Sequence, residues 1–597
     1  MNTKIKIIFF ALALFSLNAC NKDFLEITDP NNPTEETFYT SVKNAQLAVN
    51  GVYGEFHDEH LYFGEIFYIL MYSTGEAEYV HPESRYTDFN NYNYGPTNSL
   101  IAGYYKGWYR IIGRANNVIG GLNQMIETGN FNAADLSQIQ AMKGQCYFLR
   151  GLAYSYLIRS FGQLMPTHPE YNPSLPGVVV ADTIITSREQ MYKDRSSCGE
   201  VYDLIINDFK MAEKLLPVSW PETEAGKATK GSAQAYLGET YVYLKDWNNA
   251  KTYFDKILNN SQYKLMSNFA DNFDYEHINN SESLFEVGFN NMTISYTGTY
   301  SYRLLALQSW GTTQVRNSTI DKFSSSVILN DQTLAEGLKA KQTVVGSLYK
   351  SYVDTLYNIS VPLNGNSWES KEAYLEYIRP KTNIPYYRTL PDGSLTYERG
   401  VAQWLNAVSP KDPRLNPTVY IPKNDYLVVF NPTTNTWSKK IFDFNNYGIK
   451  KYIPDSIEVE AAKAAGMGND GHMSMNFRIM RLDDVYLYYA EVMEQLGNSN
   501  QAKEYLNKIV RRANELPINT PSPVDVSPTD IMSEIHNQTF LETCLEGKIW
   551  FHYRRWNIAA QEWTKYGYKE NKNECLPIPQ GEFDSNPGIK IQNKGYN

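Results

Sequence analysis

Residues 231–257 read GSAQAYLGETYVYLKDWNNAKTYFDKI. Small and large side chains in this stretch recur at the spacing of a tetratricopeptide repeat, a helix-turn-helix unit of about 34 residues. Gly238 and Ala250 are the small residues at which two helices can approach closely, and Phe254 and Ile257 are large residues that fill the space between them. The stretch therefore predicts a pair of packed helices.

Three further segments carry related patterns. Residues 484–510 repeat the same offsets, and residues 141–161 form a first helix whose partner, at 200–216, follows an insertion and stops before a proline. A fourth pair is placed at 37–56 and 104–126. Because one such unit cannot bury its apolar face alone, the units must stack. The sequence predicts a mainly α protein whose scaffold is made of four tetratricopeptide-like helix pairs, at about 37–56, 101–162, 200–260 and 476–512.

The insertions have a different composition. Residues 262–475 are rich in Asn, Gly, Pro, Tyr and Trp, and strand-like pieces stand at 283–289 and 426–430. Residues 57–100 resemble them, and a helix capped near Thr529 or Asp530 opens the C-terminal part, 530–597. Since binding residues tend to sit on loops held by a rigid scaffold, we expect 262–475 to be an irregular lobe that carries the ligand site.

The N-terminus has the pattern of a targeting signal. Lys4 and Lys6 precede an apolar run at 7–17, which is too short to cross about 30 Å of hydrocarbon. The run ends in Leu17-Asn-Ala-Cys20, which matches a bacterial lipobox. We expect cleavage after residue 19 and lipid on Cys20, which would anchor the chain to a membrane. The alternative is an ordinary signal peptide followed by a cysteine that is there by chance.

Composition excludes some functions. The net charge is −10 and both signs are mixed along the 597 residues, whereas a nucleic-acid partner would need a basic face. The 47 tyrosines suit a surface that handles polar ligands, because each joins an apolar ring to a polar tip. The cysteines other than Cys20 allow disulfides, but a chain of this length does not need them, so we expect them to be free: Cys146, Cys198, Cys544 and Cys575.

The motifs that resemble chemical sites are weak. Residues 466–471 spell G-x-G-x-x-G without a preceding strand, and His57 and His60 are two possible metal ligands that lack a third. Asp483 and Asp484 begin a predicted helix, where neighbouring side chains do not face each other across a substrate bond. The sequence therefore predicts no catalytic site, no metal and no cofactor.

Several blocks, in order along nearly the whole chain, resemble one known family. They are the lipobox with DFLE at 23–26, KATKG at 227–231, DPRL at 412–415, FRIMRLDDVYLYYAE at 477–491, LETCLEGKIWFHYRRW at 541–556, CLPIPQGEFDSNPG at 575–588 and QNKGY at 592–596. The chain resembles the SusD/RagB family of nutrient-binding outer-membrane lipoproteins of Bacteroidetes. It departs from the family pattern at Lys548 and His552, where the usual residues are His and Asp, and at Gln538-Thr539, where they are Glu and Arg.

The resemblance implies one SusD-like unit over 20–597, with four tetratricopeptide-like helix pairs and an irregular lobe. It also implies a non-catalytic lid that delivers a ligand, usually an oligosaccharide, to a SusC-like TonB-dependent outer-membrane transporter. Some relatives bind peptide instead, so a peptide-binding lid stays open. A scaffold or an enzyme built on the same repeats is the alternative from another class. An exposed aromatic platform favours the lid over the scaffold, and two carboxylates opposed in a cleft would favour the enzyme.

The ligand site needs its own prediction, because the family blocks read as framework. A sugar site needs an aromatic ring to stack on and nearby Asn, Asp or Arg to form hydrogen bonds. Two loop regions, 88–94 and 296–316, supply both. Burial of some of these rings in the core is the alternative. Our candidates are Trp310 first, then Tyr92 and Tyr296 as stacking rings, with Asn91, Asn93, Tyr94, Tyr302 and Arg316.

Overall fold

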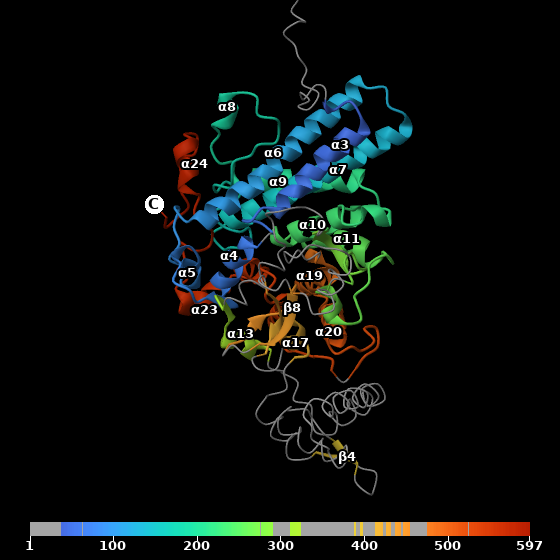
Figure 1. Ribbon diagram of the computed structural model, residues 1–597, viewed down its shortest axis with the longest axis vertical. Coiled ribbons are helices and arrows are strands. Elements are labelled where there is room, and N and C mark those ends of the chain that lie inside the picture. Colours follow the sequence, from blue (N-terminus) through green and yellow to red (C-terminus); the bar gives the residue numbers. More distant parts are fainter. Residues whose placement is uncertain are drawn as a thin grey trace, which may run out of the picture.

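The computed structural model describes residues 38–62, 64–274, 276–289, 311–323, 412–421, 442, 446–453, 475–522 and 524–596, together with the backbone of four short strands between 387 and 441. Helices dominate this part of the chain (Figure 1). The longer helices are α3 (Val42–Gly54), α4 (Glu65–Thr74), α6 (Ser99–Thr128), α7 (Ala133–Phe161), α9 (Cys198–Leu215), α10 (Lys230–Tyr243), α11 (Trp247–Leu258), α19 (Leu482–Gln495), α20 (Ser499–Ala513) and α21 (Ile531–Thr543). The shorter ones are α5 (Ser84–Asn90), α8 (Arg188–Met191), α13 (Asn317–Lys322), α17 (Leu415–Thr418), α22 (Ile549–Arg555), α23 (Ala559–Trp563) and α24 (Gln580–Ser585). The predicted mainly α fold is confirmed.

The pair α10 and α11 shows why the opening stretch folds as it does. Helix α10 is capped by Thr229, whose side chain accepts a hydrogen bond from the backbone of Ser232 in a capping box. A Cβ atom at Gly238 would lie only 2.3 Å from the ring of Phe254 in α11, so the close approach of the two helices requires glycine there. The tetratricopeptide-like packing predicted from the small and large residues is therefore present.

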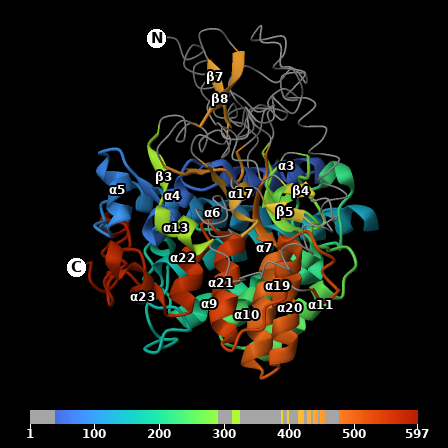
Figure 2. The same cartoon turned by 90° about the horizontal axis from the view of Figure 1, so that it is seen from below.

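The helix pairs are joined by buried polar contacts as well as by apolar packing. Arg159 in α7 donates to Glu239 in α10 at 2.9 Å, and the Tyr488 hydroxyl in α19 donates to the same carboxylate at 2.9 Å. The rings of Phe254 and Tyr488 stack at 6.0 Å. Figure 2 shows α10, α11, α19 and α20 side by side. One glutamate thus holds helices of three different pairs together.

The remaining helix pairs differ in how closely they match the prediction. Helices α7 and α9 pack as expected, with Gly151 placed where a Cβ atom would lie 3.0 Å from Phe209. Helix α6 packs along α7, and α3 lies against both of them (Figure 1). The fourth pair is therefore part of a layer of three helices.

The strands of the described residues form five antiparallel two-stranded sheets. Their bounds are β1 (Ala77–Tyr79) with β3 (Thr313–Val315), β2 (Ser283–Val287) with β10 (Phe477–Arg481), β4 (Tyr387–Thr389) with β5 (Leu395–Tyr397), β6 (Val419–Tyr420) with β9 (Gly448–Ile449), and β7 (Tyr426–Asn431) with β8 (Thr436–Ile441). The strand-like pieces predicted at 283–289 and 426–430 are β2 and β7. The sheets β4–β5 and β7–β8 join consecutive strands, whereas the other three join strands that are separated by other elements. The motif at 466–471 lies outside the described residues.

Residues 57–100 differ from the prediction, which placed irregular structure there. They contain α4 and α5, and the rings of Tyr68, Tyr72, Tyr86 and Phe89 on these helices are buried. Tyr68 and Tyr72 stack at 5.5 Å, as side chains four residues apart on one helix can. Because Asn, Asp and Gly lie between the aromatic residues, the sequence resembles a loop although its ring spacing is helical.

Two further predictions concern the cysteines and the membrane. Cys146, Cys198, Cys544 and Cys575 are all buried and free, as expected. Cys20 lies outside the described residues. Among the residues described, every helix is too short or too polar to span a lipid bilayer.

Glu76, which directly precedes β1, is a buried carboxyl group at the base of the β1–β3 sheet. Its Oε1 accepts a hydrogen bond from Leu545 N at 2.6 Å, and its Oε2 lies 2.6 Å from the Thr74 hydroxyl. That hydroxyl has one hydrogen, which it can give to Met71 O at 2.8 Å, so a protonated Glu76 completes the set of donors and acceptors. Burial raises the pKa of Glu76 to about 7, against smaller opposing effects of these hydrogen bonds and of Lys451.

The stability of the protein should therefore depend on pH through Glu76. Between about pH 4.5 and pH 7 the folded state keeps the proton on Glu76, whereas the unfolded chain has lost it. The stabilisation that this proton gives is therefore fully present below pH 4.5 and is lost as pH rises through about 7. We expect Glu76→Gln, which is neutral at every pH, to gain on the order of 1–3 kcal/mol over the wild type between pH 4.5 and pH 8.

Urea denaturation of both proteins at a series of pH values measures this difference. Glu83→Gln, at an exposed position just beyond β1, is the matched control and should follow the wild-type curve. Parallel curves for Glu76→Gln and the wild type from pH 4.5 to pH 8 would contradict the assignment.

Candidate functional site

The β1–β3 sheet links the two predicted ligand regions: β3 belongs to 296–316, and the backbone of Tyr79 in β1 forms two hydrogen bonds with the side chain of Asn90 in 88–94. Glu78 pairs with Gln314 in its register, and Val80 N donates to Thr312 O at 2.9 Å just beyond the strand ends. Val80 is 46% exposed, so this edge is at the surface. Figure 2 shows β3 and α13 beside α4. The segment that follows β1 therefore lies next to the segment that contains residue 316.

The chain that leads into the second region is held by His57. The ring of His57 stacks on Phe289 at 4.8 Å, and its Nε2 lies 2.8 Å from Gly288 O. Residues 290–310 connect Phe289 to Gly311, so both ends of this segment are attached to the stretch 57–80. The candidates Tyr296, Tyr302 and Trp310 belong to that segment and lie outside the described residues.

Arg316 lies directly after β3 and makes two contacts. Its guanidinium is 3.2 Å from Glu78 and stands 4.6 Å from the centroid of the Tyr566 ring. Its side chain is 20% exposed, although its Nε atom is buried. Arg316 is thus oriented by a carboxylate and an aromatic face, and the exposed part of its guanidinium, which carries several N–H donors, suits it to hold a polar ligand.

Asn91 and Asn93 lie on the surface, and Asn91 is next to the turn that follows Tyr566. Both are exposed, and the backbone carbonyl of Asn91 packs against Gly567, where a Cβ atom would come within 2.5 Å of it. Gly567 has φ +101°, a conformation that favours glycine. Since Gly567 follows Tyr566, one turn contacts both Asn91 and Arg316. We call the group Glu78, Asn91, Asn93, Arg316 and Tyr566 the ribbon site.

Tyr92 and Tyr94 are not part of this surface, contrary to the prediction. They are 3% and 1% exposed. The Tyr92 hydroxyl donates to Ser73 O, its ring meets Tyr568 edge-on at 5.3 Å, and the Tyr94 ring stacks on Phe89 at 5.0 Å. Tyr92 has φ +58°, which turns its side chain inward between two exposed asparagines. These rings are core packing, the alternative that the sequence left open.

The structure adds Glu78 and Tyr566 to the site, and the sequence prediction missed both. No local pattern connects them to Arg316, because the contact between Arg316 and Glu78 depends on the pairing of β1 with β3, two strands that lie far apart in the sequence. A buried or half-buried guanidinium needs a compensating carboxylate nearby, but the sequence alone offers many carboxylates. Tyr566 carried a weak signal, because it precedes a glycine within the C-terminal framework.

The described residues hold two groups whose carboxylate or imidazole atoms lie close enough to share a metal ion. One is the partly exposed set Asp271, Asp274 and His277, and the other is the buried set Glu282, Asp483 and Glu542. His277 Nδ1 lies 2.8 Å from both oxygens of Asp274, so this imidazole already has a partner. Neither set includes His57 or His60. His60 instead contacts Asp58 at 3.2 Å and Glu65 at 3.4 Å.

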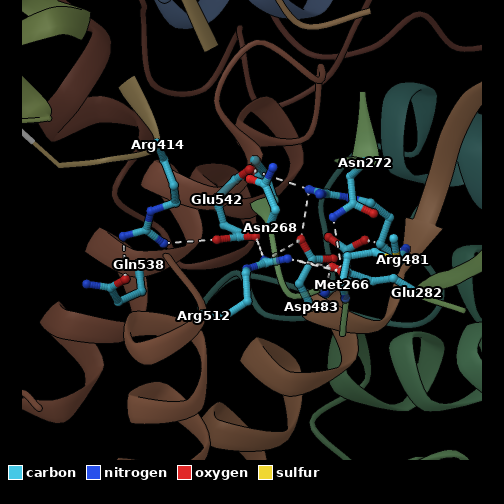
Figure 3. Close-up of polar contacts among 12 residues, drawn as sticks. Met266, Asn268, Asn272, Glu282, Arg414, Arg481, Asp483, Arg512, Gln538 and Glu542 are labelled. Atoms are coloured by element: carbon cyan, nitrogen blue, oxygen red, sulfur yellow. Dashed lines mark hydrogen bonds and ion pairs between the residues drawn. The ribbon is translucent and has the colours of Figure 1, made fainter. Parts of the chain in front are cut away.

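The buried carboxylates are neutralised by arginines (Figure 3). Arg512 pairs with Glu282 at 3.0 Å and with Glu542, and Arg414 pairs with Glu542 at 2.9 Å. Arg481 pairs with Asp483 at 2.8 Å. Guanidinium groups therefore occupy the positions that a cation would take. We call these six residues, Glu282, Arg414, Arg481, Asp483, Arg512 and Glu542, the buried ion network.

The charge states within this network follow from its geometry. Burial alone would raise the pKa of Glu542, but Arg512 and Arg414 hold it well below its ordinary value. Burial raises the pKa of Asp483, and Arg481 opposes this only in part. Asp484, the other carboxylate of the predicted pair, accepts from Arg481 N at 2.8 Å and pairs with Lys548 at 2.5 Å. Both aspartates are thus engaged in structural contacts.

The buried ion network is connected to the ribbon site through short strands. Arg414 immediately precedes α17, which continues into β6, and β6 pairs with β9. The carbonyl of Tyr447, just before β9, accepts a hydrogen bond from Val315 N of β3 at 2.9 Å. Since β3 also pairs with β1, the position of Arg316 depends on contacts that begin in the network.

Comparison with protein-family models gives three matches. Residues 281–596 match the SusD family, and residues 23–244 match a family described as starch-binding and associating with the outer membrane. Residues 233–261 match a tetratricopeptide repeat, which confirms the prediction made from residues 231–257.

Individual proteins are similar over their whole length. The chain is 24% identical to SusD-like protein P2 of Formosa agariphila, covering 99% of this chain and 100% of that protein. It is 22% identical to a SusD-like protein of Bacteroides ovatus, covering 100% of this chain and 92% of that protein.

Solved structures share the fold. A SusD superfamily protein from Bacteroides vulgatus superposes with a TM-score of 0.61 at 21% identity, covering 93% of this chain and 99% of that one. A laminarin-binding SusD-like protein superposes with a TM-score of 0.63 at 19% identity, covering 94% of this chain and 100% of that one.

Removing one member of the buried ion network should strongly destabilise the folded protein. Arg512→Ala would leave Glu282 and Glu542 buried with one fewer compensating charge, and we expect a loss of about 3–5 kcal/mol in the free energy of unfolding. Arg511→Ala is the matched control: Arg511 is also buried, but the carboxylates that it would leave behind, Glu504 and Asp525, are 43% and 20% exposed. Because water can reach these carboxylates, we expect a smaller loss for the control, about 1–2 kcal/mol.

Chemical denaturation of the full chain measures both losses. Arg512→Lys keeps the charge and provides a variant that folds if Arg512→Ala does not; its loss should fall between those of the other two variants. Equal losses for Arg512→Ala and Arg511→Ala would contradict the role assigned to the network.

Proposed function

Because the chain belongs to the SusD family, we propose that it is a surface lipoprotein that captures oligosaccharide at the ribbon site and delivers it to a SusC-like TonB-dependent outer-membrane transporter. SusD-like proteins bind carbohydrate without catalysing a reaction, so the chain is a binding protein and not an enzyme. The observation that carries the proposal is the link between the two predicted ligand regions, which runs through the β1–β3 pairing and the contact of Tyr79 with Asn90.

The chemistry of the ribbon site supports a sugar ligand. Sugars offer hydroxyl groups to acceptors and donors, and flat C–H faces to aromatic rings. Glu78 and the exposed asparagines supply acceptors, and the partly exposed guanidinium of Arg316 supplies donors. Trp310, which directly precedes Gly311 in the sequence, is our candidate for the stacking ring. Tyr296 and Tyr302, which come earlier in the same segment, are further candidates. The laminarin-binding neighbour supports a glycan rather than a peptide as the ligand class.

The proposals for the lipid anchor and for the transporter partner are based on the sequence and on the family. The lipobox places lipid on Cys20, and one matching family model describes association with the outer membrane. A lid that hands ligand to a transporter must stay beside it, which a lipidated N-terminus permits. We therefore propose attachment to the outer membrane through Cys20, with the ribbon site directed toward the transporter.

Ligand binding should depend on the ribbon site. We expect Trp310→Ala and Arg316→Ala each to weaken glycan binding about tenfold to a hundredfold, since a stacked ring or a charged hydrogen bond contributes on the order of 1–3 kcal/mol. Tyr92→Phe is the control. Its ring is buried and faces away from the surface, so binding should be unchanged.

Calorimetry with a panel of oligosaccharides and peptides measures this, with thermal melting to confirm that each variant is folded. Unchanged affinity in both Trp310→Ala and Arg316→Ala would contradict the placement of the site. If the protein binds peptides but no oligosaccharides, its ligand is a peptide, as in the alternative given by the sequence analysis.

Membrane attachment should depend on one residue. Cys20→Ala removes the thiol that would carry lipid, and we expect the variant to be released from membranes while it stays folded. Fractionation followed by a carbonate wash measures the distribution. If Cys20→Ala stays in the washed membrane, the anchor assignment is wrong.

A further inference from the structure

A pocket outside the ribbon site shares no residue with it. It has a volume of about 290 Å³ and lies between the loop that precedes α10 and the loop that leads into β2. The residues of its lining that matter here are Trp220, Lys227, Gln262, Tyr263, Asn279 and Glu286.

One wall of the pocket is aromatic and fixed in position. The Trp220 indole donates its Nε1 hydrogen to Ala228 O at 2.8 Å, and Lys227 Nζ stands 5.0 Å from the centre of its ring. The Tyr263 ring is 9% exposed, and its hydroxyl lies 3.2 Å from Thr229 Oγ1. Because these contacts fix both rings before a ligand arrives, binding would cost little side-chain entropy.

The carboxylate in the lining is held by the protein. Glu286 is 3% exposed, and its Oε1 accepts from Asn279 N at 2.8 Å and from Asn476 Nδ2 at 2.5 Å. Its Oε2 is buried and lies 3.5 Å from Arg478 Nε. The side chains left for a ligand are therefore the aromatic wall and the exposed amides of the lining.

The charges of the lining are already compensated. Lys227 pairs with Glu224 at 2.7 Å, and Glu286 faces Arg478. An anionic or cationic ligand would therefore find no unpaired opposite charge among the two charged residues of the lining, both of which are described. The aromatic wall and the exposed amides of Gln262 and Asn279 instead match a neutral ligand that carries several hydroxyl groups.

We propose that this pocket is a second carbohydrate site, which binds one or two neutral sugar units of a longer glycan. The choice of ligand class rests on the proposed function. Two sites on one chain raise the avidity for a polysaccharide, because binding at one raises the effective concentration at the other. A short oligosaccharide that reaches only one site gains nothing, so the pocket would favour long glycans.

The test compares the wild type with two pocket variants and a matched control. Trp220→Ala removes the aromatic wall, and Ser219→Arg places a long side chain at an exposed position of the lining without altering the core. Trp247→Ala is the control, because Trp247 is also partly buried but begins α11 outside the pocket. Trp310→Ala serves as the reference for the ribbon site.

Binding is measured with the full chain in a detergent that lacks a sugar headgroup, on an array of neutral polysaccharides and short oligosaccharides that includes laminarin, with charged polysaccharides alongside. We expect both pocket variants to bind neutral polysaccharides at least about tenfold more weakly than the wild type, while Trp247→Ala binds normally. Thermal melting confirms that each variant is folded.

The other outcomes separate the two proposals. If Trp310→Ala weakens binding and both pocket variants bind every glycan as the wild type does, the second site is wrong and the proposed function stands. If the wild type binds no glycan on the array, both proposals fall. A loss that is confined to charged polysaccharides would overturn the assignment of a neutral ligand.

Discussion

Charge compensation inside the protein is the constraint on which the rest of the structure depends. Glu542 lies between Arg512 and Arg414, and Arg512 also reaches Glu282. These residues come from α20, α21, the turn before β2 and the segment before α17. A buried charge is tolerated only when its partner is in place, so these distant segments must assemble together. The strands that lead to the ribbon site begin at this point.

The tyrosine-rich composition serves the core more than the surface. Many tyrosines are buried with their hydroxyl groups paired, such as Tyr488 on Glu239 and Tyr92 on Ser73. Burial raises the pKa of Tyr92 well above its ordinary value, so it remains a neutral donor. A buried phenol needs such a partner, and the helical scaffold supplies them. An abundance of tyrosine therefore does not by itself mark a binding surface in this fold.

A part of the structure could be predicted when the residues that determine it lie close together in the sequence. The pairs α10–α11 and α19–α20 could be predicted because their small and large residues stand close together in the sequence. The caps at Thr229 and Asp530 are equally local. The β1–β3 pairing could not be predicted, because it joins segments on either side of most of the scaffold. For the same reason the sequence offers Arg316 and the exposed asparagines as candidates but not Glu78 or Tyr566, and it could not tell that Tyr92 turns inward.

The departures from the family pattern fit the same rule of compensation. Lys548 stands where the resemblance expects His, and it pairs with Asp484 at 2.5 Å and Glu546 at 3.6 Å. His552 stands where Asp is usual, and burial, aided by Arg555, lowers its pKa well below the ordinary value, so it is neutral. Arg555 does not need an acid at 552, because Glu491 already binds it through both oxygens at 2.5 and 2.7 Å. A position in the framework can therefore change its charge when a neighbouring ion pair keeps the net charge of the buried side chains balanced. Because the framework compensates its own changes, the residues of the ligand surface are free to vary independently.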